Sequence, residues 1–134
     1  MSSPPSTVRA IVAGHATFAA GLVSAVDAIT GRGGVFRAVS GAGLAAADVA
    51  ALLASALDET GAMVVFTDLP GGSATLAARR MQRERAGLTV VIGVNLPTLL
   101  EFAMREGAAK DDVAAAVDRG RENIRIVDTP SNVG

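Results

Sequence analysis

A run of apolar residues, Ala62-Met-Val-Val-Phe-Thr67, is followed by Asp68-Leu-Pro-Gly-Gly-Ser73 and then by a stretch with helical character, residues 74–85. A short apolar run without polar alternation is typical of a strand that is covered on both faces of a sheet. The two glycines indicate a tight turn, and Ser73 is a suitable N-cap for the helix that follows. This unit therefore predicts a fold in which strands alternate with helices.

The same alternation extends in both directions along the chain. The pattern predicts strands at 8–13, 35–39, 62–67 and 88–94, helices at 18–29, 44–57, 74–85, 96–105 and 111–122, and a last short strand at 123–127. Strands that regularly alternate with helices favour right-handed crossovers. We therefore predict an α/β fold: a doubly wound, mainly parallel four-stranded sheet with helices on both faces. The order of the strands is not readable from this pattern.

Length and composition limit the domain organisation. The 134 residues are 50% hydrophobic and 19% charged, which suits one domain with a real core and excludes a disordered chain. We expect residues 1–7 to be a disordered lead-in, residues 8–127 to form the single domain, and residues 128–134 to be a flexible tail.

Charge and residue types exclude several functional classes. A formal net charge of −1 argues against a surface that follows nucleic acid phosphates. The absence of cysteine excludes a disulfide scaffold and a thiolate zinc site, and one histidine cannot build a multi-histidine metal centre. No apolar run approaches the roughly 20 residues of a membrane span, and the first residues do not resemble a signal peptide. We therefore expect a soluble, cytoplasmic domain.

Polar side chains follow three of the predicted strands. His15 comes after the first strand with Gly14 before it, Asp68 comes after the third, and Asn95 comes after the fourth. Ligands of open α/β sheets bind beyond the carboxyl ends of the strands. These residues are therefore the candidates for a functional site.

The chemistry of these groups favours phosphoryl transfer. A neutral imidazole is a competent nucleophile, and one ring nitrogen attacks phosphorus best when an acceptor holds the other. Asp68 is the candidate acceptor for His15. Backbone amides at a glycine-rich turn that opens a helix are donors for phosphoryl oxygens, which points to Gly71, Gly72 and the Ser73 hydroxyl. Gly14 and Asn95 are candidates for supporting roles.

Each of these residues also has a purely structural interpretation. His15 suits a hydrogen-bonded structural role, Asp68 suits the opening of a turn, and Gly71-Gly72-Ser73 suits a tight connection. Asn95, placed before Leu-Pro, suits the N-cap of the fourth helix better than a site residue. The charge run 79–85, which contains four arginines, is typical of a solvated helix face, with a docking surface as the alternative.

Three stretches of this chain together resemble a known family. They are Ile11-Val-Ala-Gly-His15-Ala-Thr-Phe-Ala-Ala-Gly21, Val65-Phe-Thr-Asp68-Leu-Pro-Gly-Gly-Ser73 and Ile92-Gly-Val-Asn95-Leu-Pro-Thr-Leu-Leu-Glu101. Their order and intervals, across residues 8–127, resemble the mannose-family enzyme IIA domain of the bacterial phosphoenolpyruvate-dependent sugar phosphotransferase system. Three motifs in order are far more specific than one Gly-Gly turn.

The resemblance implies a phosphocarrier. Domains of this family accept a phosphoryl group from phospho-HPr and pass it to enzyme IIB, which serves a membrane permease. By this resemblance His15 is the phosphorylated residue, Asp68 orients its imidazole and Ser73 contacts the phosphoryl group. The resemblance also implies a homodimer that exchanges a C-terminal strand, for which 124–127 is the matching stretch. No metal or tightly bound cofactor is expected.

The chain departs from the family pattern near the site. Family members often have glycine directly after the histidine, where this chain has Ala16. Pro70 and the stretch Ala74-Thr75-Leu76 also differ from the usual residues. These positions lie at the rim that would meet HPr and enzyme IIB, so they put the choice of partner in question more than the chemistry.

Other functions fit parts of the pattern. A regulatory module, whose phosphorylation state is read by a kinase or transcription regulator, is compatible with the same histidine. The phosphocarrier subunit of dihydroxyacetone kinase also uses a histidine on this fold, but the stretch Gly93-Val-Asn-Leu-Pro97 is nearer to the sugar branch. A receiver domain phosphorylated on Asp68 fits poorly. Receivers need an acidic pair after the first strand and a lysine near the last, whereas the lone lysine, Lys110, lies in a predicted helix.

Overall fold

The computed structural model describes residues 7–130 of the chain. Its elements are, in order, β1 (Ala10–Gly14), α1 (Phe18–Thr30), a short 3-10 helix η1 (Gly33–Val35), β2 (Phe36–Ser40), α2 (Ala46–Thr60), β3 (Val64–Thr67), α3 (Ser73–Gln82), β4 (Thr89–Ile92), α4 (Leu96–Met104) and α5 (Lys110–Glu122). The predicted alternation is therefore confirmed. Most of the predicted lead-in and the end of the predicted tail, at 1–6 and 131–134, lie outside the described residues.

All four strands of the sheet are parallel, and their order is β2-β1-β3-β4. The chain moves outward from β1 to β2 in one direction and then returns to place β3 on the other side of β1. The connections that follow β1 and β3 therefore lead in opposite directions along the sheet. β1 and β3 are neighbours, and the direction of winding reverses between them. Open α/β sheets bind ligands at such a point, beyond the carboxyl ends of the strands.

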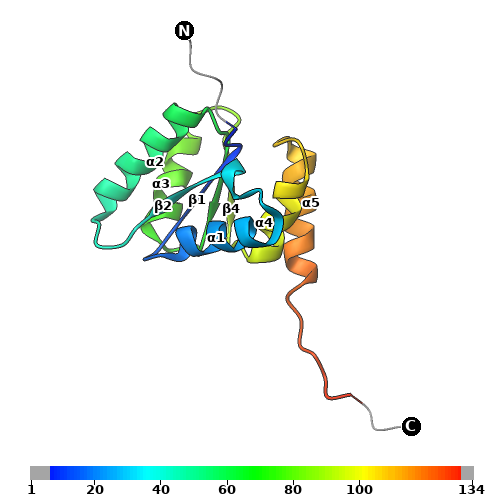
Figure 1. Cartoon of the computed structure of the whole chain (residues 1–134). Helices are drawn as coiled ribbons and strands as arrows, with labels where there is room; N and C mark the ends of the chain where they lie inside the picture. Colours follow the sequence, from blue (N-terminus) through cyan, green and yellow to red (C-terminus); the bar gives the residue numbers. More distant parts are fainter. Residues whose placement is uncertain (1–6, 131–134) are drawn as a thin grey trace.

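Helices cover both faces of the sheet, as predicted. On one face, α2 and α3 pack against the β1 residues Ile11 and Ala13. On the other face, residues of α1, α4 and α5 share one apolar cluster with Ala10 and Val12. Figure 1 shows these two groups on opposite sides of the sheet, with α5 outside α4. Alternate residues of β1 thus serve opposite layers, and each layer has its own apolar core.

The contact between α4 and α5 depends on a polar group at the start of α4. The Asn95 side chain caps α4 by accepting a hydrogen bond from the Thr98 amide at 3.1 Å, and its Nδ2 donates to the Gly120 carbonyl of α5 at 2.9 Å. A Cβ atom at position 120 would stand 1.9 Å from Thr98 Oγ1. The two helices therefore approach as closely as they do because residue 120 has no side chain.

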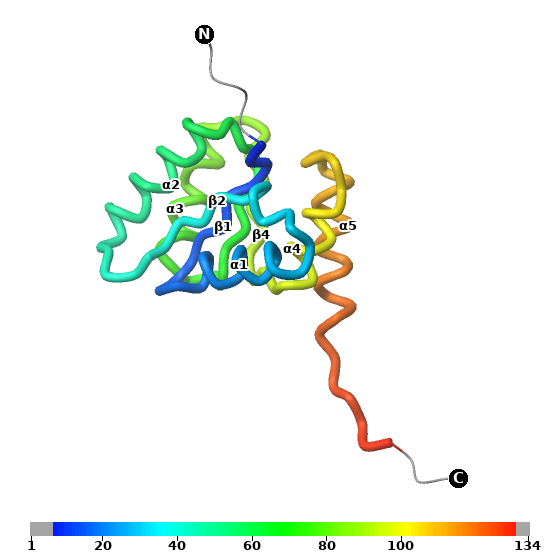
Figure 2. The backbone as a smooth tube through the Cα atoms, viewed as in Figure 1, coloured from blue at the N-terminus to red at the C-terminus, as the bar shows by residue number. Residues whose placement is uncertain are grey.

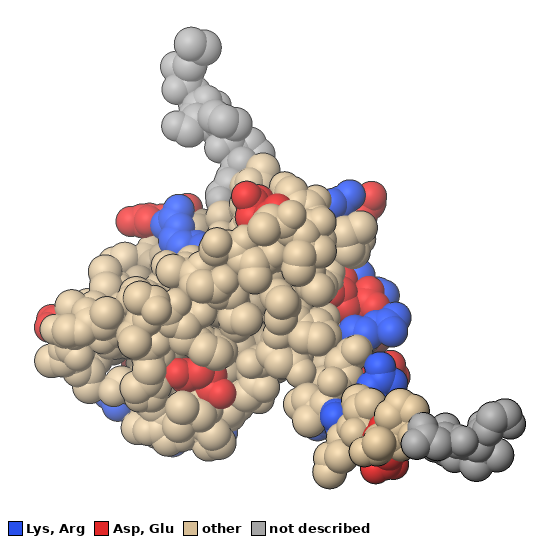
Figure 3. All heavy atoms as spheres, turned by 60° about the horizontal axis from the view of Figure 1, so that its bottom comes forward, with Lys and Arg blue, Asp and Glu red and all other residues tan. Residues whose placement is uncertain are grey.

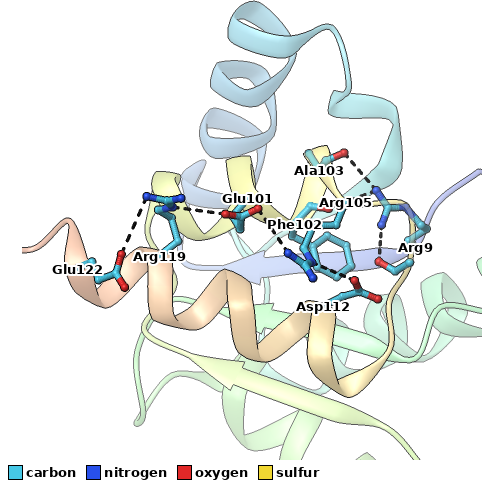
Figure 4. Close-up of polar contacts among 9 residues, drawn as sticks. Arg9, Glu101, Phe102, Ala103, Arg105, Asp112, Arg119 and Glu122 are labelled. Carbon is cyan, nitrogen blue, oxygen red and sulfur yellow. Dashed lines mark hydrogen bonds and ion pairs between the residues drawn. The ribbon is translucent and has the colours of Figure 1, made fainter.

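Ion pairs join the exposed sides of the same two helices (Figure 4). Arg105 contacts Asp112 at 3.0 Å, and Arg119 contacts Glu101 at 3.4 Å. In Figure 3 charged side chains gather on the right, the side on which α5 lies in Figure 1, while the rest of that face is mostly uncharged. Exposed pairs of this kind stabilise a fold only slightly, by about 0–1 kcal/mol each. The apolar contact and the Asn95 cap therefore fix α5 more than these charges do.

The structure corrects several sequence predictions about elements. Residues 123–127 form no strand here: in Figure 2 the chain after α5 runs away from the domain, and Ile126 is 93% exposed. A strand needs a neighbour with free backbone groups, and none lies beside this segment in the described chain. The second helix begins at Ala46, not Leu44, because Ala45 is still extended. The third begins at Ser73, which is therefore its first residue; the N-cap is Gly72.

No helix within residues 7–130 is both long enough and apolar enough to cross a membrane.

Substitution by alanine should have opposite effects on the free energy of unfolding at two helical glycines. Gly120→Ala should lower the free energy of unfolding by about 1–3 kcal/mol, because the new methyl group overlaps Thr98 and separates α4 from α5. Gly21→Ala is the matched control in α1, where a Cβ has nothing within 4 Å. It should raise that free energy by about 0.5–1 kcal/mol through helix propensity. Urea unfolding of both variants measures this difference. An equal gain in the free energy of unfolding at both sites would contradict the close packing of α4 against α5.

Candidate functional site

His15 and Asp68 meet at the carboxyl end of the β1–β3 pair. The pairing of these strands ends at Ala13 and Thr67; Asp68 follows Thr67 directly, and His15 follows Ala13 after one residue, Gly14. The His15 ring lies with Nδ1 2.7 Å from Asp68 Oδ2, and the His15 backbone amide donates to the same oxygen at 2.8 Å. One carboxylate oxygen thus holds both the backbone and the ring of His15.

The two side chains differ sharply in exposure. The His15 side chain is 62% exposed, whereas that of Asp68 is 7% exposed. A carboxylate beside Nδ1 favours the tautomer that carries its proton there, which leaves Nε2 with a free lone pair. The geometry therefore presents a nucleophilic nitrogen to the outside of the molecule, while the group that orients it stays covered.

Hydrogen bonding keeps Asp68 ionised. Burial alone would raise the pKa of Asp68, but hydrogen bonds from the His15 amide, the His15 ring and the Leu69 amide outweigh burial and lower this pKa below its ordinary value. A lowered pKa means that the folded chain gains stability from this carboxylate above the pKa of the unfolded state. That contribution is lost as the pH falls through the lower folded-state pKa.

Two glycines provide the space for this pair. A Cβ at Gly14 would stand 2.8 Å from Phe18 Cδ1 and 2.9 Å from the Asp68 carboxylate carbon. A Cβ at Gly72 would stand 2.8 Å from His15 Cε1. Gly71 differs, since a Cβ there has nothing within 4 Å. Gly14 and Gly72 are therefore packing requirements of the His15–Asp68 pair, whereas Gly71 is not.

A small hollow of about 80 Å³ lies beside His15. It is lined by Gly14, His15, Gly41, Leu44, Val49, Ser73 and Ala74. The N-terminus of α3 opens onto it through Ser73 and Ala74, and the first amides of a helix have no partners within that helix. This end of α3 thus supplies donors and a favourable dipole for an anion near His15.

Several hydroxyl groups that the sequence reasoning did not select support this region. Thr75 Oγ1, which is buried in α3, is 2.7 Å from Thr67 Oγ1 and donates to the Leu69 carbonyl at 2.6 Å. This contact fastens the Asp68 loop to α3. Ser40, at the end of β2, donates to the Ala16 carbonyl at 2.6 Å. The rule that selected His15 and Asp68, a polar residue at the carboxyl end of a strand, also applies to Ser40.

The remaining candidates lie away from the hollow. Asn95 is engaged in capping α4 and bonding α5, as its structural interpretation predicted. Arg79, Arg80 and Arg83 are exposed and line a shallow depression along α3, and Arg85 pairs with Asp58 at 2.9 Å. No group of three or more potential metal ligands occurs among the residues that the structure describes.

Comparison with known proteins agrees with this geometry. Residues 9–119 match the family model described as "PTS system fructose IIA component". The chain belongs to this family. The match covers β1 to most of α5 and includes both His15 and Asp68.

Individual relatives of this enzyme IIA domain are sugar phosphotransferase components. It is 37% identical over 78 residues to the "PTS system mannose-specific EIIAB component" of Escherichia coli K12, an alignment that covers 53% of this chain and 23% of the relative. The chain thus spans less than a quarter of that protein.

Solved structures share the fold over nearly the whole domain. The mannose/sorbose specific IIA subunit from Enterococcus faecalis has a TM-score of 0.82 and 25% identity, covering 92% of this chain and 97% of that one. A component EIIA from Streptococcus agalactiae has a TM-score of 0.77 at 23% identity, covering 89% and 96%. At that lower identity the likeness shows the fold alone.

The contrast between the two adjacent glycines of this enzyme IIA domain is testable. Gly72→Ala should displace the imidazole, because its methyl group would overlap His15 Cε1, and should weaken the hydrogen bond from the ring to the charged Asp68, which is worth about 1.5–3 kcal/mol. Gly71→Ala is the control and should leave the ring in place. The nitrogen chemical shifts of the His15 ring report this directly by NMR. Equal shifts in the two variants would contradict the packing assigned to Gly72.

Proposed function

We propose that this domain is a phosphocarrier, which accepts a phosphoryl group from phospho-HPr on His15 Nε2 and passes it to enzyme IIB for sugar uptake and phosphorylation. The observation that carries the proposal is the exposed imidazole held at Nδ1 by Asp68, at 2.7 Å. Membership of the enzyme IIA family supports the same chemistry.

The proposed transfer is balanced between two imidazoles. The lone pair of His15 Nε2 forms the new N–P bond while the N–P bond of phospho-HPr breaks, and its electron pair returns to the donor nitrogen. The proton on His15 Nδ1 stays there throughout, because the positive charge that develops on the ring is offset by Asp68. The reverse sequence delivers the phosphoryl group to enzyme IIB. The protein's task is mainly positioning and electrostatic stabilisation.

The other candidate residues have defined parts in this proposal. The Ser73 hydroxyl and the first amides of α3 would contact the phosphoryl oxygens beside the hollow. Gly72 would act by admitting the ring, and its own amide lies 3.4 Å from the Leu69 carbonyl in a turn. Gly71 would keep the turn open to the approaching partner. Leu69 and Leu76, both exposed near this turn, would contact HPr or enzyme IIB.

Substitution of the pair tests the proposal. In a mixture of radiolabelled phosphoenolpyruvate, enzyme I and HPr, the wild-type domain should become labelled and His15→Ala should not. Asp68→Asn should keep the fold and slow labelling by about 10- to 100-fold, because it removes a hydrogen bond to a charged acceptor worth about 1.5–3 kcal/mol.

The stability of the label identifies the phosphorylated group. Phosphate on histidine is labile in acid and stable in alkali, so acid treatment should release it. Labelling of His15→Ala at another residue would overturn the assignment of the nucleophile. An unchanged rate in Asp68→Asn would remove the proposed role of that carboxylate.

We also propose that the domain forms a homodimer by exchanging its C-terminal segment. β4 is the last strand of the sheet, so one of its edges has no neighbouring strand in the described chain. A hollow of about 140 Å³ along this edge is bounded by β4, the start of α4 and the end of α5. The exposed apolar residues Ile124, Ile126 and Val127 of a second copy are suited to cover it.

The dimer proposal predicts a specific loss of association. Ile126→Asp should shift the domain toward a monomer in sedimentation equilibrium, because it places a charge in an apolar interface. Ile29→Asp is the matched control, since Ile29 is also an exposed isoleucine but lies on α1. The control should associate like the wild type. A wild-type domain that remains monomeric at high concentration would exclude the exchange.

A further inference from the structure

Ala16, directly after His15, has a backbone conformation that alanine disfavours. Its φ is 46°, and among residues 7–130 it is the only residue other than glycine with a positive φ. In this region the Cβ of an L-residue crowds its own backbone, so the conformation persists only where surrounding contacts hold it. The Ala16 side chain is exposed and offers no packing to do so. One restraint is the turn bond across Ala16, in which the Phe18 amide donates to the His15 carbonyl at 3.0 Å, and any further restraint must also come from hydrogen bonds to the backbone.

The end of β2 supplies a further restraint, the one that involves a side chain. Ser40 Oγ donates to the Ala16 carbonyl at 2.6 Å, and the amide of Ala42 donates back to Ser40 Oγ at 3.3 Å. The next residue, Gly41, donates from its amide to the Gly14 carbonyl at 3.0 Å. Ser40 and Gly41, which are consecutive at the end of β2, thus donate hydrogen bonds to Ala16 and Gly14, the residues on either side of His15.

This arrangement connects Ser40 to the orientation of the imidazole. The backbone amide and the ring of His15 both bond Asp68 Oδ2, so a rotation of the backbone at residues 15 and 16 would disturb both bonds. Without the Ser40 hydroxyl, Ala16 has no side-chain restraint against relaxing to an ordinary negative φ. Such a relaxation turns the peptide that follows His15 and moves the ring away from the carboxylate.

We propose that Ser40 is a positioning residue for His15: its hydroxyl holds Ala16 in the left-handed conformation that keeps the imidazole on Asp68. The consequence for phosphoryl transfer rests on the function proposed above. The structural part, the effect of Ser40 on the unphosphorylated ring, does not depend on that function.

A double-mutant cycle with Ala16 tests the proposal. Ser40→Ala should lower the rate of His15 labelling at saturating phospho-HPr by about fivefold, the loss of one ordinary hydrogen bond, with little change in the concentration that gives half the maximal rate. Ser40→Thr keeps the hydroxyl and should recover most of the rate. In an Ala16→Gly background the same Ser40→Ala change should cost less than about twofold, because glycine adopts positive φ without strain.

Thr60→Ala is the matched control. Thr60 also donates a hydroxyl hydrogen bond to a carbonyl, that of Ala56 at 2.7 Å, but it lies at the end of α2 remote from His15. Its loss should leave the labelling rate unchanged. An unchanged rate in Ser40→Ala, or an equal loss in the wild-type and Ala16→Gly backgrounds, would overturn the proposal.

NMR of the unphosphorylated protein separates this inference from the proposed function. The Nδ1 signal of His15 should shift in Ser40→Ala and return in Ser40→Thr. If the wild-type domain takes no label but these shifts occur, the phosphocarrier function fails and the positioning role of Ser40 stands. If the domain is labelled but the ring signals do not change in Ser40→Ala, the positioning role fails.

Discussion

The pairing of β1 with β3 is the constraint on which the site depends. Ala13 is paired with Thr67, and beyond this pair the two strands lead into different loops, β3 directly and β1 after Gly14. This places the His15 backbone amide and ring against one oxygen of Asp68. A shift of register by one residue would exchange the faces of either strand and remove both hydrogen bonds. The apolar residues that fix the register in both layers therefore also fix the distance between imidazole and carboxylate.

Short loops that are fastened to covered elements hold the site residues in place. The small residues Ala74, Ala77 and Ala78 let α3 lie close to the sheet, so its N-terminus comes near His15. The buried hydroxyl pair of Thr75 and Thr67 joins the same helix to the strand that carries Asp68. A carboxylate in such surroundings keeps a lowered pKa and remains charged while it orients the ring. The contacts that pack α3 against the sheet thus also position the groups around His15.

Much of this arrangement was predictable from the sequence, and the remainder was not, for physical reasons. Regular alternation of apolar runs with helical periodicity predicts the layers, and a polar residue after each strand selects His15 and Asp68. Strand order depends on which helices cover which face of the sheet. That His15 and Asp68 are neighbours therefore required the structure or a family resemblance. Ser40 also follows a predicted strand, but its role depends on a bond to the Ala16 carbonyl and on the positive φ of Ala16, neither of which the sequence pattern shows. The strand expected at 123–127 failed because a single chain offers it no neighbour.

The asymmetry between an exposed imidazole and a covered carboxylate has a consequence for the chemistry. Asp68 is shielded by this chain alone, but the nitrogen that would carry the phosphoryl group stands in water. Electrostatic contacts to a transferring group are stronger once water is excluded, and the described chain does not close over the site by itself. A protein partner that docks over exposed apolar residues such as Leu69 and Leu76 would complete that enclosure. On this view the donor and the acceptor each form part of the reaction site, which explains why the domain presents a fixed, open nucleophile rather than a deep pocket for a small substrate.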